Sequence, residues 1–240
     1  MILRDVHLLA LATWLFFGLI AGCARITDPN SSEITRIDYD FETSSQGWIG
    51  DFADYPDQPD AETFYNFQFS HSSLPHPLNQ SDGALMQSGV NRSDDLFMFI
   101  KKKVNGLAPR KSYRVDIEIE FASNAANGMV GVGGAPGESV FIKAGASANE
   151  PGKILSSTDQ WFRMNLDKGN QSQEGADMKL IGHFANGTDL NSYTLKVLKT
   201  ATPIVVQSNS QGEIWIVIGT DSGFEGLTRI YYNEISVSIQ

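Results

Sequence analysis

The segment from residue 113 to residue 121 alternates without a break between apolar and charged side chains. A period of two is typical of a β-strand with one face in a core and the other in water, whereas a helix repeats about every 3.6 residues. The segment therefore predicts a sheet with one buried face. The apolar side chains are Tyr113, Val115, Ile117, Ile119 and Phe121, and the charged ones are Arg114, Asp116, Glu118 and Glu120.

Shorter apolar runs follow along the chain. Residues 235–239 alternate in the same way, and residues 214–218 are apolar on both faces, which predicts a central strand. Turn-forming clusters, such as residues 133–137 and 209–212, separate the runs. Many short strands with turns between them are typical of a β-sandwich or barrel, and no long segment has a helical period. Less regular runs predict strands at 64–69, 96–102, 140–143, 161–166, 179–183, 193–198 and 204–207.

These patterns predict an all-β fold, a single β-sandwich of jelly-roll type over residues 37–240. A β-domain of about 200 residues is an ordinary length for one core. Cys23 is the only cysteine, so this core has to form without disulfides. Residues 24–33 are mostly small or polar. They predict a flexible tether, which we assign to residues 23–36.

The first 22 residues have the pattern of a secretory leader. Arg4 is followed by an apolar run between Val6 and Ile20, and small residues stand before Cys23. A basic start, an apolar stretch and a small-residue cleavage site are typical of a signal peptide. The run is shorter than the about 20 residues of a membrane span. An ordinary signal peptide whose cleavage site borders a cysteine is the alternative to a lipid anchor.

The motif Ile20-Ala21-Gly22-Cys23 resembles the lipobox of bacterial lipoproteins. The resemblance implies that residues 1–22 are removed and that Cys23 becomes a lipidated N-terminus with acyl chains such as palmitate. Several chains would hold the protein firmly at a membrane, since each buried methylene contributes about 0.8 kcal/mol. The expected location is extracytoplasmic, and Ala24 in place of an aspartate resembles sorting to the outer membrane.

The charge of the chain limits its partners. It has 18 basic and 28 acidic side chains, a net charge of −10 at neutral pH. The balance is unchanged without residues 1–22, because that segment holds one arginine and one aspartate. Such a surface repels nucleic-acid phosphates and anionic lipid, so nucleic acid is excluded as a partner. The predicted contact with a membrane is the lipid on Cys23.

Three segments together resemble jelly-roll carbohydrate-binding modules of the galactose-binding-like group. Residues 38–48 contain Phe41-Glu42 and, after a short polar turn, Gly47-Trp48, which is similar to the opening strand of those modules. Residues 230–237 are similar to their last strand, and residues 104–113 resemble the entry to a middle strand. The resemblance implies a jelly roll that binds glycans. A lipoprotein family that shares only the fold is the alternative.

In those modules the first and last strands lie side by side and often share a structural calcium ion, which the resemblance implies for this chain. Glu42 matches the acidic position of the opening motif, and Asn233 stands where aspartate is more common. Calcium takes about six to eight oxygens from carboxylates, amides and backbone carbonyls. Glu42 and Asn233 are therefore the candidate metal ligands. The alternative is a solvated turn residue and a β-bulge.

Four residues in three polar segments are candidate ligand-binding residues. Tyr55 lies in segment 51–60, which its two prolines keep from forming a helix, and could offer a ring face to a sugar. Arg92 and Asp94 precede a predicted strand and supply a planar donor and an acceptor. Asp221 follows the central run in a glycine-rich turn. The alternatives are a charged surface loop with Phe52 turned inward and locally satisfied turns.

Three kinds of function remain open. The working hypothesis is a membrane-anchored envelope lipoprotein whose jelly roll binds glycan, or another extracytoplasmic ligand, without catalysis. The others are a structural lipoprotein that contacts an envelope protein and a glycan-active hydrolase or lyase. The sequence has no zinc-protease, serine-hydrolase or phosphate-loop motif and no paired cysteines, so we assign no catalytic residue.

Overall fold

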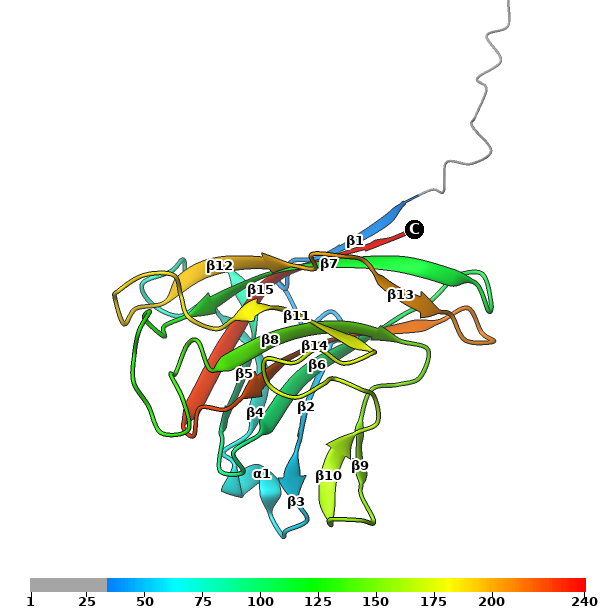
Figure 1. Cartoon of the computed structure of the whole chain (residues 1–240). Helices are drawn as coiled ribbons and strands as arrows, with labels where there is room; N and C mark the ends of the chain where they lie inside the picture. Colours follow the sequence, from blue (N-terminus) through cyan, green and yellow to red (C-terminus); the bar gives the residue numbers. More distant parts are fainter. Residues whose placement is uncertain (1–33) are drawn as a thin grey trace, which may run out of the picture. The chain divides into compact units, whose positions relative to one another are not determined.

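The computed structural model describes residues 34–240. The predicted leader, Cys23 and most of the predicted tether lie outside these residues. The described part contains two antiparallel sheets that lie face to face, with a smaller third sheet (Figure 1). The prediction of an all-β sandwich of jelly-roll type is confirmed.

Sheet A has seven strands. Five follow the order β12–β7–β15–β5–β4, while β1 pairs with β15 and β13 pairs with β7. The first and last strands are therefore neighbours, with Thr35 opposite Ile239. The strands are β1 (Thr35–Tyr39), β4 (Gln68–Ser73), β5 (Gly83–Val90), β7 (Ser112–Ser123), β12 (Thr194–Lys199), β13 (Ile204–Gln207) and β15 (Leu227–Ile239).

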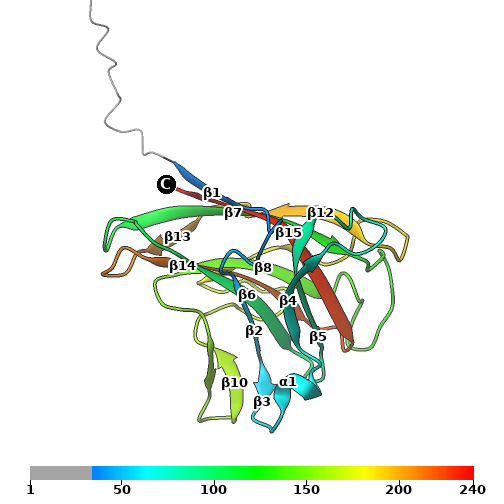
Figure 2. The ribbon, with the colours of Figure 1, turned by 180° about the vertical axis from the view of Figure 1, so that it is seen from behind.

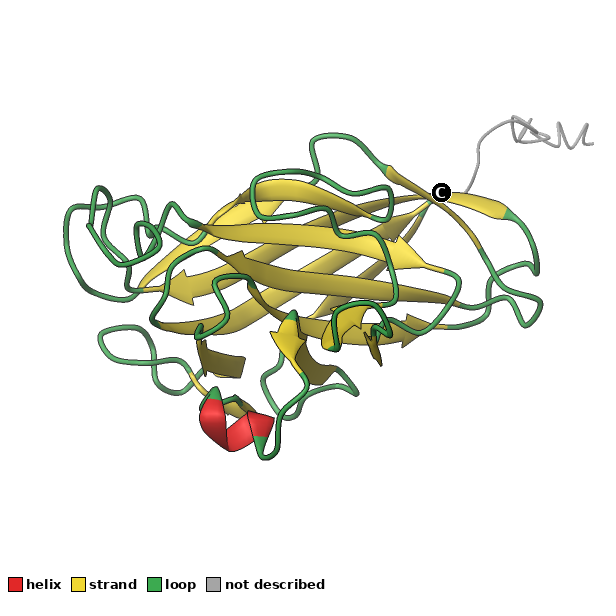
Figure 3. Cartoon of the chain, turned by 60° about the horizontal axis from the view of Figure 1, so that its bottom comes forward, coloured by secondary structure: helices red, strands yellow, loops and turns green. Residues whose placement is uncertain are grey.

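Sheet B has five strands in the order β11–β8–β14–β6–β2, and sheet C has three in the order β3–β10–β9. Figure 3 shows the helix α1 (Ala61–Phe64) at the margin of the stacked strands. Within residues 34–240 no helix is long and apolar enough to span a membrane. The strands are β2 (Ile49–Ala53), β6 (Leu96–Val104), β8 (Val140–Ser147), β11 (Met178–His183), β14 (Ile214–Ser222), β3 (Tyr55–Pro56), β9 (Lys153–Leu155) and β10 (Trp161–Met164).

The core between sheets A and B comes from alternating side chains. In β7 every second residue from Tyr113 to Phe121 is buried, as the sequence pattern predicts. The residues that sheet B turns toward them are aliphatic, such as Ile142 and Ile216. Each buried side chain of this kind contributes about 1.5–3 kcal/mol to folding, so this layer stabilises the sandwich.

The outer face of sheet B is also buried, because the residues that join β10 to β11 pass over it. We call residues 165–177 the covering segment. On this face Phe97 and Val217 pack with Met164 and Met178, which flank the covering segment. Strand β14 lies at the centre of the sheet and all nine of its residues are buried. The prediction of a central strand is therefore confirmed.

Some local predictions are wrong. Segment 51–60, predicted as a loop, begins inside β2 and also contains β3, and the predicted strand 64–69 spans the end of α1, a turn and the start of β4. Strand β5 is absent from the sequence prediction because small and polar residues are buried on both of its faces, including Gln87 and Ser88, so no alternation is visible. The sandwich begins at Thr35, slightly before the predicted boundary.

Candidate functional site

Sheet C and α1 lie at one end of the sandwich, far from β1 and the C-terminus (Figures 1 and 2). Strand β2 leaves sheet B at this end and continues into sheet C through Asp54, whose φ of 64° interrupts the strand. The turn before β6 and the loop after β14 meet here as well, because Ser222 is opposite Leu96. Several loops therefore converge on a rigid scaffold, the usual setting of a binding site.

A groove of about 380 Å³ opens between these loops. We call it the Trp161 groove. Trp161, at the start of β10, lies opposite Pro56 of β3 in the register of sheet C. The guanidinium of Arg163, on the same face of β10, stacks 4.4 Å from the centroid of the Trp161 ring. The groove is lined by Pro56, Arg92, Ser93, Asp94, Trp161 and Glu225.

The turn that carries Arg92 and Asp94 is fixed by Asn91. The Asn91 side chain accepts hydrogen bonds from the backbone N–H groups of Ser93 and Leu96, at 3.1 and 3.3 Å, and donates one to the Ser222 carbonyl at 2.7 Å. Arg92 Nε donates to the Phe64 carbonyl at 2.9 Å. These bonds hold the backbone while the side chains of Arg92 and Asp94 line the groove, where both residues are exposed.

A second hollow of about 300 Å³, the Asp95 cavity, lies next to the groove. Asp95 follows the groove residue Asp94 in sequence, and Arg163 reaches both hollows because it stacks on Trp161 and lies 3.5 Å from Asp54. The cavity is lined by Asp54, Asp95, Arg163, Met164, Leu166, Asp167, Lys168, Gly169 and Asn170.

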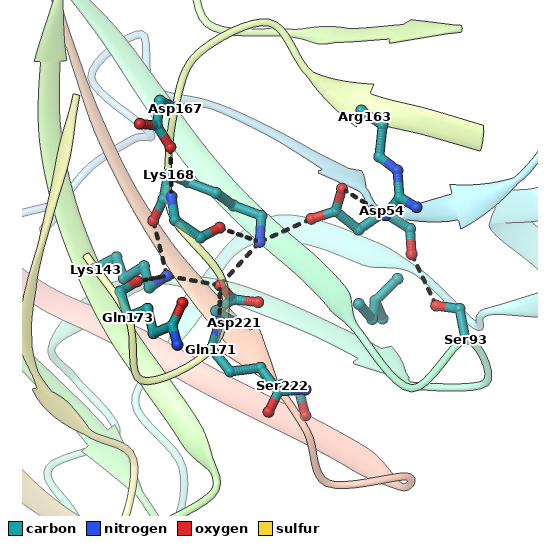
Figure 4. Close-up of polar contacts among 12 residues, drawn as sticks. Asp54, Ser93, Lys143, Arg163, Asp167, Lys168, Gln171, Gln173, Asp221 and Ser222 are labelled. Carbon is teal, nitrogen blue, oxygen red and sulfur yellow. Dashed lines mark hydrogen bonds and ion pairs between the residues drawn. The ribbon is translucent and has the colours of Figure 1, made fainter. Parts of the chain in front are cut away.

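Behind this cavity lies a buried cluster of charged side chains, drawn in Figure 4. Lys168 Nζ lies 2.9 Å from both Asp54 Oδ2 and Asp221 Oδ2, and Lys143 Nζ lies 2.8 Å from Asp221 Oδ2. Lys143 also donates to the carbonyls of Lys168 and Gln173, at 2.8 Å each. The cluster therefore ties the covering segment to β8, β14 and the β2–β3 junction.

The cluster changes the titration of its members. Burial, together with the neighbouring carboxylates of Asp221 and Asp54 and against the opposing effect of Lys168, raises the pKa of Asp95 to about 7. Burial also raises the pKa of Asp54 and lowers that of Lys143. Desolvation disfavours the charged form of any such group. Asp95 is thus partly protonated at neutral pH and can donate a hydrogen bond.

The four predicted ligand-binding residues lie at this end of the molecule but in different environments. Arg92 and Asp94 line the Trp161 groove together. Asp221 is fully buried and does not line the groove. Gln171 links the two, because its backbone N–H donates to Asp221 Oδ2 at 2.9 Å and its side chain donates to the Asp94 carbonyl at 3.3 Å. The loop position predicted for Asp221 is wrong, because β14 continues to Ser222.

Tyr55 does not offer a ring face to a ligand. It is 3% exposed and packs between Phe52 and Phe162, with ring centroids 4.6 and 5.2 Å away. Its segment is a strand of sheet C rather than a loop, so its side chain enters the small core of that sheet. Phe52 is buried as well, which agrees with the alternative interpretation that Phe52 turns inward.

Four residues of the groove and the cavity are not among the predicted ligand-binding residues: Trp161, Glu225, Asp95 and Lys168. Trp161 stands at the start of a predicted strand with Arg163 two residues later, so both fall on one face, and this spacing is a usable signal. Lys168 and Asp95 give none, because their partners are distant in sequence and come together only in the folded chain.

The predicted calcium ligands do not line the groove: Asn233 lies in β15 of sheet A, and Glu42 lies in the bend after β1. Asn233 forms a β-bulge between Tyr232 and Glu234 and donates to Glu120 Oε1 at 2.7 Å. Glu42 accepts from the Gly83 N–H at 3.4 Å. No group of three or more acidic, histidine or cysteine side chains in residues 34–240 is arranged to hold a metal ion. Calcium stays a prediction, and calorimetric titration of chelator-treated protein checks it.

No family model matches the sequence, and no curated protein does. Among solved structures, the chain is similar to TmCBM27, a carbohydrate-binding module studied for mannan recognition, at 10% identity and a TM-score of 0.38, over 87% of this chain and 99% of that one. TmCBM61, solved with β-1,4-galactotriose, matches at 12% identity and a TM-score of 0.36, over 81% and 89%.

An adhesin domain of Lys-gingipain from Porphyromonas gingivalis matches at 11% identity and a TM-score of 0.41, over 84% of this chain and 98% of that one. A tailspike protein of bacteriophage CBA120 matches at 12% identity and a TM-score of 0.36, over 82% of this chain but only 20% of the tailspike. At these values the similarities carry no conclusion about what the chain binds.

Proposed function

We propose that this chain is an extracytoplasmic lipoprotein, tethered through Cys23, whose sandwich binds a neutral glycan without catalysis in the Trp161 groove. The observation that carries the glycan proposal is the composition of that groove. It brings an aromatic ring, a guanidinium and two carboxylates, those of Asp94 and Glu225, around one hollow.

This set of groups matches the two sides of a sugar ring. The C–H face of a pyranose is apolar and packs on an aromatic ring, and tryptophan offers the largest such surface. The hydroxyl groups of the sugar both donate and accept. Carboxylates accept from them, and a guanidinium donates to them in a fixed planar geometry. The volume of the groove is within the range of about 300–1,000 Å³ that is usual for ligand sites.

The charge of the groove favours a neutral sugar. Asp94 and Glu225 outnumber Arg92, and the whole chain carries a net charge of −10. An acidic polysaccharide would approach against this field and lose affinity. We therefore expect binding to neutral polymers such as mannans, galactans or glucans, and weaker binding to uronic-acid polymers.

The test is affinity electrophoresis and calorimetry with a panel of neutral and acidic polysaccharides. We expect Trp161→Ala and Arg92→Ala each to weaken binding about tenfold or more, the loss of about 1.4 kcal/mol. Arg114→Ala is the matched control, because Arg114 is exposed on β7 of sheet A. Retention by none of the polymers, or equal binding by Trp161→Ala and the control, would contradict the proposal.

A further inference from the structure

Lys143 and Asp221 form the most deeply buried charged pair in residues 34–240. Both side chains are 0% exposed, and Lys143 Nζ lies 2.8 Å from Asp221 Oδ2. They come from the adjacent antiparallel strands β8 and β14, where Lys143 is opposite Gly219 and Asp221 is opposite Phe141. Since alternate residues share a face, the two side chains are diagonal neighbours on the outer face of sheet B. The fold therefore holds an amine and a carboxyl in fixed contact.

This pair is sealed from solvent by the covering segment. The carbonyls of Lys168 and Gln173 accept from Lys143 Nζ on the side away from the sheet. Removing a pair of opposite charges from water costs free energy that their attraction only partly restores. Burial lowers the pKa of Lys143, against the opposing effect of Asp221. The lowered pKa makes it easier for the Lys143 ammonium group to lose a proton and become the neutral amine, which is the nucleophilic form of lysine.

Asp95 supplies an acid beside the carboxyl group. The neighbouring carboxyl of Asp221 raises the pKa of Asp95. Asp95 Oδ1 and Asp221 Oδ1 are both buried, and neither has a hydrogen-bond partner in residues 34–240. A proton shared between the two carboxyls satisfies both oxygens, and it can be passed to Asp221 Oδ1 as a general acid passes a proton to a leaving group.

The other oxygen of Asp221 faces two donors besides Lys143 Nζ. Oδ2 accepts from Lys168 Nζ and from the backbone N–H of Gln171, at 2.9 Å each. Donors placed in this way stabilise the negative charge that develops on a carbonyl oxygen during attack at its carbon. A nucleophile, an acid and an oxyanion site therefore surround one carboxyl carbon.

We propose that Lys143 and Asp221 condense into an intramolecular amide that joins β8 to β14. Nζ forms a bond with the Asp221 carboxyl carbon, and the bond from that carbon to Oδ1 breaks. Of the three protons of the Lys143 ammonium group, one stays on the amide nitrogen and two leave with Oδ1 as water, relayed by Asp95. Oδ2 becomes the amide oxygen. The reaction releases one water and needs no oxidant, reductant or cofactor.

The amide leaves fewer charged groups buried than the ion pair of Lys143 and Asp221 does. Lys168 keeps its ion pair with Asp54, and its ammonium continues to donate to the Asp221 oxygen. The amide N–H serves one of the two carbonyls that Lys143 contacts. The enclosed placement also limits the return reaction, because water reaches the bond only if the covering segment opens.

The test is peptide mapping by mass spectrometry of the full-length chain after denaturation and digestion with trypsin. Acylated Lys143 resists cleavage, so the amide predicts that fragment 115–153 is joined to fragment 200–229, about 18 Da below the sum of the two masses. This readout does not depend on sugar binding, so its failure and that of the glycan proposal are distinguishable. Fragments 115–143, 144–153 and 200–229, each separate and unmodified in the native protein, would overturn the inference.

Variants identify the bond. Lys143→Arg keeps the positive charge but cannot form this amide, so trypsin cuts after residue 143 and we expect fragments 115–143, 144–153 and 200–229 at full mass. Lys199→Arg, at an exposed lysine of β12, is the matched control and should keep the joined fragments. Asp95→Asn should leave most of the chain unjoined, because the proton relay is lost. An 18 Da loss that persists in Lys143→Arg indicates a cyclised aspartate or a Lys168 linkage and counts against the inference.

Discussion

The two faces of sheet B are both buried, but by different chemistry. The inner face presents aliphatic residues such as Ile142 and Ile216 to sheet A. The outer face combines Phe97, Phe99 and Val217 with the buried charges of Lys143 and Asp221 beneath the covering segment. The inner layer tolerates small changes in shape, because apolar packing has no direction. The outer layer depends on each charge having its partner.

The largest loss of stability is expected from Asp221→Ala on the outer face. This change removes the carboxyl group that Lys143 and Lys168 share in a buried site. Breaking a buried ion pair in this way lowers the free energy of unfolding by about 3–5 kcal/mol. Urea denaturation measures it, with the exposed Asp189→Ala as control. A loss as small as that of the control would show that the outer layer does not depend on its charges.

Ile216→Ala is expected to cost somewhat less, about 2–4 kcal/mol, because it opens a cavity in the inner layer without leaving a charge unpaired. The control is Val205→Ala, since Val205 is 70% exposed. The same denaturation experiment gives both values. If Ile216→Ala proved more damaging than Asp221→Ala, the proposed difference between the two faces would be reversed.

Titration of Asp95, on the outer face, is expected to change the free energy of unfolding with pH by less than the two substitutions above. Because the pKa of Asp95 is raised from 3.8 to about 7 in the folded protein, the folded state binds more protons than the unfolded state between these values. The contribution of protonated Asp95 to the free energy of unfolding is complete below about pH 4 and is lost as the pH rises through about 7. Asp95→Asn should remove this part of the profile. Melting temperatures from pH 4 to 8 that change identically in both proteins would contradict the assignment.

Cys23→Ala tests the proposed tether and should affect neither face. Without the cysteine no lipid can be attached, so we expect the protein to leave the membrane fraction while its melting temperature and sugar binding stay the same. Mass spectrometry of the native N-terminus checks the lipid directly. An unmodified thiol on a full-length product would rule the tether out.

The same contrast explains what the sequence could and could not predict. The alternation in residues 113–121 predicts the strand β7 and its inner face, because one side meets water and the other meets the core. Where both faces of a strand are buried, as in β5, the pattern vanishes.

Only part of the candidate site is predictable from the sequence, because a local pattern does not reveal partners that are distant in the chain. Arg92 and Asp94 were selected from local turn chemistry, and they do share the groove. Trp161 is distant in sequence and reaches the groove only through the pairing of β10 with β3. The partners of Asp221 come from β8 and the covering segment, so no local pattern could reveal that this aspartate is buried.

The pairing of β1 with β15 places residue 34 and the C-terminus together, at the end of the domain opposite sheet C (Figure 1). The chain therefore enters the domain on the side remote from sheet C. A force applied to the chain at residue 34 would act first on the hydrogen bonds between Thr35–Tyr39 and the last strand. The groove would experience this force only after β1 had separated from β15.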